Sequence, residues 1–187
     1  PACPSKHTGA SANRWDVRAR KNLEKNLTAL QNREIFTNRS RYSRTVLDIN
    51  RVLALAGIPY QARLSLADYL DASHSPVKSG DLLEAAEMPH TNPFYPYFAP
   101  RLCQLLAESP EYIGFSMNFL SQALCTMAMA GFIKKIHPRQ KIILGGSLAT
   151  SFVKVAGSTN LFPGLMDEVV SGAGEAKLLH LLGVENP

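Results

Sequence analysis

The stretch from Tyr112 to Leu182 most constrains how this chain can fold. Three short strand-like runs, at residues 112–117, 141–144 and 167–170, each lead directly into glycine or a small polar residue. Between the first two runs lies a segment from about Ser121 to Ile136 that is apolar nearly all round, as in a buried helix. The order strand–loop–helix, strand–loop, strand–loop–helix is typical of right-handed crossovers in a parallel sheet. We therefore expect an α/β fold.

The N-terminal part predicts two helices. The first runs from about residue 14 to residue 31 and carries one narrow apolar stripe on an otherwise charged surface. The second runs from Ser40 to Ala56, and Gly57 followed by Pro59 ends it. The residues of the first stripe are Trp15, Ala19, Leu23, Leu27 and Leu30.

The middle part predicts smaller elements. Residues 60–66 alternate weakly, as in a short strand, and residues 71–80 have the composition of a loop. Asp81 is placed to cap a short helix. Two prolines within residues 92–98 predict a bent, extended linker rich in aromatic residues, followed by a helix from Phe98. Two roles are open to these aromatic side chains: packing between the helical part and the sheet, or covering a bound ligand. We prefer the packing role.

These elements divide the chain into three parts. Residues 1–57 form a basic helical extension, residues 58–110 a short strand, an aromatic linker and a helix, and residues 111–187 a βαβ unit. The expected architecture is a partial Rossmann-like (flavodoxin-like) parallel sheet of three to four strands with a helical N-terminal extension. The chain begins with Pro rather than Met, as an excised piece of a longer protein would.

Charge and cysteine content narrow the possible partners. Residues 1–50 hold ten Lys and Arg against four Asp and Glu, whereas residues 51–187 hold ten against eleven. The cations of the first helix are spread over several faces and interleaved with acids, so a solvated docking face is preferred to a nucleic-acid surface. The three cysteines show no pairing pattern, which favours a reducing, cytoplasmic setting. No apolar run reaches the ~20 residues that a membrane helix needs, so no membrane partner is expected.

The ends of the predicted strands supply a candidate binding site. In an open parallel sheet, ligands bind at the carboxyl ends of the strands, where loops 116–119, 145–150 and 171–175 would meet. Glycines there would let a ligand approach the backbone, while hydroxyl, amide and backbone N–H groups would bind it. Each glycine pair alone is explained better as a simple turn, but three such loops on one edge favour a binding cleft. The hydrogen-bonding side chains in the first two loops are Ser116, Asn118, Ser147 and Thr150.

Groups that could carry out chemistry unaided are not recognisable in the sequence. The histidines lie apart from one another and from cysteine, so no metal-ligand spacing occurs. His74, in a polar loop, is a candidate for catalysis, although simple solvation explains it better. Cys125 fits an apolar helix face as a small hydrophobic residue. We expect no catalytic and no metal-ligating residue in this chain.

Three segments in this order resemble a known family. IGFSMNFLSQA, IKKIHPRQKIILGG and MDEVVSGAGEAKLLHLL are similar to the cobalamin (B12)-binding domain that precedes the catalytic barrel in B12-binding radical S-adenosylmethionine proteins. The resemblance extends over residues 58–182 and is weak over residues 1–57. It implies corrinoid contacts from ten residues. They are Ser116, Met117, Asn118, Gly145, Gly146, Ser147, Ser171, Gly172, Gly174 and Glu175.

The chain departs from the family pattern in several ways. Ala173 stands where the family usually has the first Glu of GEGE. No histidine is placed to replace the lower axial base of cobalamin. No Cys-x-x-x-Cys-x-x-Cys is present, so the 4Fe-4S cluster and S-adenosylmethionine would belong to a separate catalytic domain of the same parent chain.

The resemblance thus implies a fragment that positions a corrinoid for methyl transfer or another radical reaction, and that is not itself catalytic. Two alternatives stay open. One is a non-catalytic interaction module with a degenerate cleft. The other is a nucleotide- or phosphate-binding regulatory domain.

Overall fold

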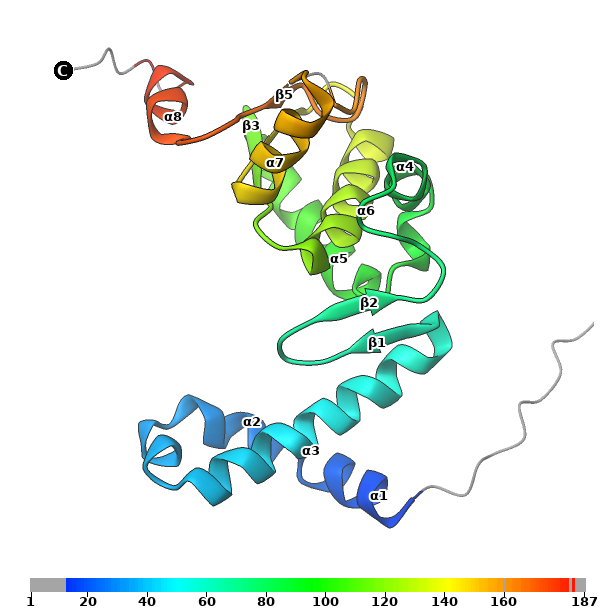
Figure 1. Cartoon of the computed structure of the whole chain (residues 1–187), viewed down its shortest axis with the longest axis vertical. Helices are drawn as coiled ribbons and strands as arrows, with labels where there is room; N and C mark the ends of the chain where they lie inside the picture. Colours follow the sequence, from blue (N-terminus) through cyan, green and yellow to red (C-terminus); the bar gives the residue numbers. More distant parts are fainter. Residues whose placement is uncertain (1–12, 160, 182, 184–187) are drawn as a thin grey trace, which may run out of the picture. The chain divides into compact units, whose positions relative to one another are not determined.

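The computed structural model describes residues 13–159, 161–181 and 183, and the chain falls into two compact units. Unit 1 is residues 1–70 and unit 2 is residues 71–187. Figure 1 shows the elements of both units, which are described separately below. The boundary between them follows a strand pair that belongs largely to unit 1, whereas the sequence suggested divisions at residues 57 and 110. None of the described helices is long and apolar enough to cross a membrane.

Unit 1 is built on one long helix with two short helices beside it. The prediction of a single helix over residues 14–31 is wrong, because the chain breaks at Asn22. Asparagine is a poor helix former, and here it ends one helix and begins the next. The predicted second helix is confirmed. The helices are α1 (Arg14–Lys21), α2 (Leu23–Gln31), the 3₁₀ turn η1 (Arg33–Thr37) and α3 (Arg39–Gly57).

A small hairpin follows α3. After the 3₁₀ turn η2 (Ile58–Tyr60), strand β1 (Ala62–Leu64) confirms the short strand expected at residues 60–66. Its partner β2 (Tyr69–Asp71) was not predicted, and its last residue falls in the segment 71–80 that was interpreted as loop. Gly57 is required here for space, because a Cβ on it would lie 2.2 Å from the carbonyl oxygen of Ala62. The hairpin therefore packs directly on the end of α3.

Three helices of unit 2 pack together. Gly131 of α6 lets α4 cross closely, because an added Cβ would lie 1.9 Å from the carbonyl oxygen of Ala86. Asp81 does not cap α4 as expected: the helix begins two residues earlier, and the Asp81 carboxylate accepts a hydrogen bond from the backbone N–H of Ser75 at 2.7 Å. The helices are α4 (Ser79–Glu87), α5 (Tyr95–Ala107) and α6 (Leu120–Ile136), with the 3₁₀ turn η3 (Pro89–Thr91) between the first two.

The aromatic segment is largely helical rather than an extended linker. Helix α5 begins at Tyr95, not at Phe98, because Pro96 falls in the first turn, where its missing N–H costs nothing. Tyr95 and Phe98 pack edge to face against Phe132 of α6, with ring centroids 5.8 and 6.2 Å away. These two rings join helix to helix within unit 2.

The α/β fold is confirmed by a parallel sheet of three strands in the described part of unit 2. The strand order is β3–β4–β5, with Ile113 opposite Ile142 and Phe115 opposite Leu144. One helix was not predicted: α7 begins at Ser147, in a region interpreted as loop. The bounds are β3 (Tyr112–Ser116), β4 (Lys141–Gly145), α7 (Ser147–Ala156), β5 (Glu168–Val169) and α8 (Glu175–Leu181).

The two faces of this sheet differ. Ile142 and Leu144 of β4 are fully buried, whereas Gly114 and Lys141, which alternate with the buried positions, are exposed. The core of unit 2 therefore lies on one face of the sheet, with the buried residues of α6. At the amino ends of the strands, Lys134 of α6 donates to Asp167 at 2.7 Å.

Candidate functional site

The carboxyl ends of β3, β4 and β5 meet at one edge of the sheet, because the three strands are parallel. The ten residues that the family resemblance singles out all lie on or next to this edge. All of them are at least partly exposed except Met117, whose exposed fraction is 1%. The side chain of Met117 is part of the core and does not offer a contact to a ligand.

The loops after β3 and β4 are hydrogen-bonded to each other. The backbone N–H of Ser147 donates to the side-chain oxygen of Asn118 at 2.9 Å, and the Ser147 hydroxyl donates to the Asn118 carbonyl at 3.1 Å. The Asn118 amide also donates to the Ser116 hydroxyl at 3.1 Å. Asn118 thus joins both strand ends, and part of its hydrogen-bonding capacity is used within the protein.

The two adjacent glycines after β4 have different roles. Gly146 has φ +104°, and a Cβ there would lie 2.4 Å from the carbonyl oxygen of Met117 and 2.8 Å from the side-chain oxygen of Asn118. The space beside Gly146 is therefore filled by the neighbouring loop and is not open to a ligand. Beside Gly145, no atom lies within 4 Å of an added Cβ. Close approach of a ligand is possible at Gly145.

Helix α7 changes the second loop. Residues 147–150 are its first turn, so the N–H groups of Ser147 and Leu148 point at the loop after β3. Leu148 donates to the carbonyl of Met117 at 3.1 Å. Sequence reasoning missed this helix, although Leu148, Phe152 and Val155 repeat at spacings of four and three.

Gln122 is a further residue at this edge that sequence reasoning did not identify. Its side-chain oxygen accepts hydrogen bonds from the backbone N–H groups of Asn118 and Phe119, at 2.7 and 3.1 Å. A glutamine in the first turn of a helix is a familiar capping signal, and it could have been found from the sequence.

The third loop is the most open part of the edge. Ser171, Gly172, Ala173, Gly174 and Glu175 are all exposed. A hydrogen bond of 2.9 Å joins this loop to α7, from the Gly172 N–H to the Thr150 hydroxyl, and Gly172 has the positive φ of +85° that favours glycine. The loop offers hydroxyl, carboxylate and backbone groups to solvent.

His74 and Cys125 lie outside this edge, and their neighbours shift the pKa of each. His74 lies between the carboxylates of Asp71 and Glu84, with nitrogen–oxygen distances of 3.2 and 3.6 Å. Burial acts to lower the pKa of His74, but the hydrogen bonds and charges of both carboxylates together raise it above its usual value. Burial raises the pKa of the Cys125 thiol to about 11, so this cysteine is protonated and unreactive at neutral pH.

Asp167 lies at the opposite end of the strands. Its partial burial acts to raise the pKa, but hydrogen bonds from Lys134 and from the N–H of Ile142, with the charges of Lys134 and Lys141, lower it below the usual value. The carboxylate is therefore charged and joins α6 to β4. Among the residues that the structure describes, no three His, Cys, Asp or Glu side chains are arranged to hold a metal ion.

Comparison with family models, with curated proteins and with solved structures found no match for this chain.

Proposed function

We propose that unit 2 binds a corrinoid at the edge formed by the three strand ends, as part of a B12-dependent radical S-adenosylmethionine enzyme. The observation that carries the proposal is the exposed edge itself, where the ends of three parallel strands bring the expected residues together. In this account the sheet belongs to a larger Rossmann-like domain. The catalytic domain of the parent chain would supply the 4Fe-4S cluster and S-adenosylmethionine.

The residues at this edge suit a large, amide-rich ligand. Gly145 leaves room for the flat macrocycle to approach the backbone. The Ser171 hydroxyl, the backbone around Gly174 and the Glu175 carboxylate are exposed and can bind the amide groups at the macrocycle's rim. The bound cobalamin would supply the cobalt that carries a methyl group, and these protein groups would orient it. No histidine lies on the three loops, so the axial position would not be filled from this edge.

The strand order supports a larger sheet. In doubly wound folds, the ligand crevice lies where the strand order reverses, and the order β3–β4–β5 contains no reversal. The proposal therefore requires a further strand beside β3. In the described sheet β3 is an edge strand with β4 on one side, which leaves its other side available for a further strand.

A second candidate is an interaction module whose cleft has degenerated. The hydrogen bonds that Asn118 makes with Ser116 and Ser147 favour it, because groups bonded to each other offer less to a ligand. The two candidates predict opposite outcomes in the experiment that follows.

The test is a titration of the full 187-residue chain with hydroxocobalamin, followed by visible absorption and equilibrium dialysis. The corrinoid proposal predicts saturable one-to-one binding that weakens in Gly145→Val. Gly114→Val is the matched control, because it adds the same side chain to an equally open strand glycine two residues before the strand end. Equal binding by both variants and the unchanged chain would favour the interaction module. If the chain shows no saturable binding, the same titration is made on a longer piece of the parent protein: binding there supports the corrinoid proposal, and absence of binding there favours the interaction module.

A further inference from the structure

Folding brings cations from three helices of unit 1 around one hollow. The hollow has a volume of about 340 Å³ and lies between α1 and α2 on one side and α3 on the other. Four basic side chains and a single carboxylate line it, so its lining is strongly positive. The lining residues are Arg18, Asn22, Lys25, Asn26, Ala29, Arg41, Arg44, Thr45 and Asp48.

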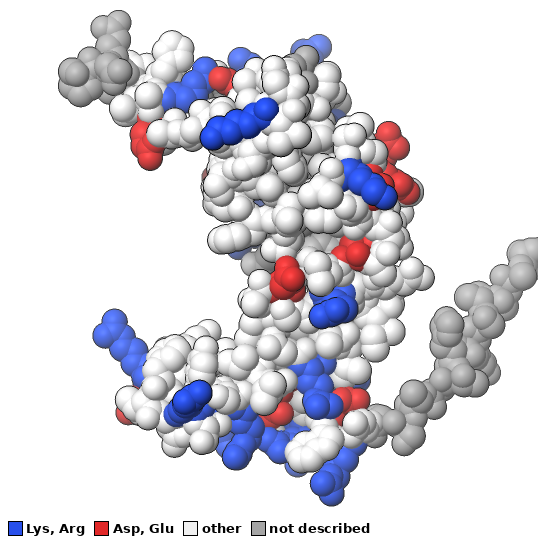
Figure 2. Space-filling model, in the orientation of Figure 1, with Lys and Arg blue, Asp and Glu red and all other residues white. Residues whose placement is uncertain are grey.

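Most of this charge is not neutralised within the protein. Arg18 pairs with Asp48 at 3.4 Å. Within the described part of the chain, Lys25, Arg41 and Arg44 form no ion pair. Figure 2 shows blue side chains gathered over the helices of unit 1. Like charges held together in this way repel one another, and an anion between them would relieve the repulsion.

The hollow also contains a hydrogen-bond donor without a partner. The side-chain nitrogen of Asn26 is buried and has no acceptor among the residues that the structure describes. A buried donor without an acceptor destabilises a fold, so such a group normally has a partner. The half-buried Asn22 and the buried Thr45 line the same hollow and add polar groups. A shift of the side chains that cover this nitrogen would let an anion in the hollow supply the acceptor that it lacks.

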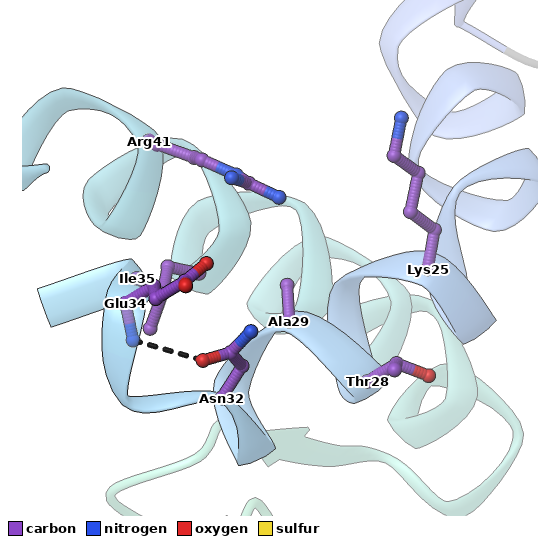
Figure 3. A pocket seen from close by; sticks show the side chains of 7 residues that line it. All are labelled: Lys25, Thr28, Ala29, Asn32, Glu34, Ile35 and Arg41. Carbon is purple, nitrogen blue, oxygen red and sulfur yellow. Dashed lines mark hydrogen bonds between the residues drawn. The ribbon is translucent and has the colours of Figure 1, made fainter.

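A second hollow of about 310 Å³ adjoins the first, and the two share Lys25, Ala29 and Arg41. In Figure 3, Lys25 and Arg41 stand on either side of the small Ala29 side chain, with Thr28 and Asn32 on α2 and at its end. Apart from the two shared cations, this second hollow is lined by uncharged residues and Glu34. It suits the uncharged part of a ligand whose anionic group lies in the first hollow.

From these observations we propose that unit 1 binds a phosphate ester, with its phosphate in the hollow lined by Arg18, Lys25, Arg41 and Arg44. A phosphate carries up to two charges and several acceptor oxygens, which matches clustered guanidinium groups and a spare amide donor better than a single carboxylate would. The sequence indicated cations scattered over several faces of one helix. The break at Asn22 and the packing on α3 instead bring two of them, Arg18 and Lys25, together with Arg41 and Arg44 of α3.

Trp15 provides a built-in reporter. It is the chain's single tryptophan, and the Arg18 guanidinium lies 5.5 Å from the centre of its ring. An anion that draws Arg18 inward changes this contact, so binding should alter the fluorescence of Trp15. The experiment is a titration of the full chain with inorganic pyrophosphate in low-salt buffer, and then with ribose 5-phosphate.

The test compares two double variants that remove the same charge. Arg41→Gln with Arg44→Gln removes two cations from the hollow, whereas Arg20→Gln with Arg39→Gln removes two exposed cations outside it. Each lost charge-assisted bond should weaken binding about tenfold, so the first pair should raise the Kd on the order of a hundredfold. The second pair should change the Kd by less than about threefold.

The Asn26→Leu variant provides an independent readout. The proposal predicts weaker pyrophosphate binding in this variant. Circular dichroism checks that each variant remains folded. Absence of a saturable response, or equal loss in both double variants, would overturn the proposal, because the response would then reflect net charge alone.

A single-stranded oligothymidylate in the same titration separates the two sources of phosphate. Tighter binding of ribose 5-phosphate supports a small-molecule ester, and tighter binding of the oligonucleotide supports a nucleic-acid backbone.

Discussion

Replacing Gly146 should disrupt the join between the two strand-end loops, whereas replacing Gly145 should not. The backbone of Gly146, at φ +104° and ψ 171°, lies in a region that is essentially restricted to glycine and costs other residues about 1–3 kcal/mol. In Gly146→Ala the new Cβ would also lie 2.4 Å from the Met117 carbonyl oxygen, and overpacking of this kind costs about 1–3 kcal/mol more. We therefore expect Gly146→Ala to lower the free energy of unfolding by about 3 kcal/mol or more.

Gly145→Ala is the matched control. No atom lies within 4 Å of its added Cβ, and Gly145 is the last residue of strand β4. Because glycine within a strand is less stable than alanine by about 0.5–1 kcal/mol, this variant should be as stable as the unchanged chain or slightly more so. Urea denaturation followed by circular dichroism measures both. Equal stability of the two variants would refute the argument that the loop after β3 fills the space beside Gly146.

Three further predictions concern packing and titration. Gly131→Ala should lower the free energy of unfolding by about 2 kcal/mol, because its Cβ would overlap the backbone of α4. Gly80→Ala should raise the free energy of unfolding slightly, because no atom lies within 4 Å of its added Cβ. Urea denaturation measures both variants. The raised pKa of His74 adds stability that is fully present below about pH 6.5 and is lost as the pH rises through the folded-state pKa. In His74→Gln the melting temperature should therefore depend less on pH over that range. A pH dependence equal to that of the unchanged chain would contradict this. At pH 7.5, iodoacetamide should modify the exposed Cys103 much faster than Cys125, as mass spectrometry of the peptides would show, and equal rates would contradict the burial of Cys125.

The parts of the fold that sequence reasoning predicted well are those with strong, long-range patterns. Helix α6 is apolar nearly all round over 17 residues, and strands β3 and β4 are apolar runs that end at small residues. Such patterns reflect burial, which the tertiary structure reinforces. Their order was sufficient to predict a parallel sheet and to place the candidate edge.

The elements that sequence reasoning missed depend on the propensity of one residue or on partners that are distant in the sequence. Strand β2 has three residues, two of them polar or exposed, and exists because β1 pairs with it. Helix α7 is rich in small and β-branched residues with weak helix propensity, and its first turn is held by the loop after β3. The break at Asn22 interrupts a stripe whose spacing fits a continuous helix. For β2 and α7 the deciding interaction lies outside the local pattern, whereas at Asn22 the low helix propensity of asparagine favours the break.

At the candidate site, the sequence predicted which residues share an edge but not which of them face a ligand. Both Gly145 and Gly146 fit close approach of a ligand, and only the folded loop shows that Met117 fills the space beside Gly146. The burial of the Met117 side chain is likewise a result of packing. The basic hollow of unit 1 could not be predicted, because its four cations come from three helices.

The central claim is that the three strand-end loops bind a corrinoid. Hydrogen exchange measured by mass spectrometry, on the full chain with and without excess hydroxocobalamin, tests it most directly. Corrinoid binding should slow exchange in peptides covering residues 116–119, 145–150 and 171–175 and leave unit 1 unchanged. Unchanged exchange in all three loops, or protection confined to other segments, would contradict it.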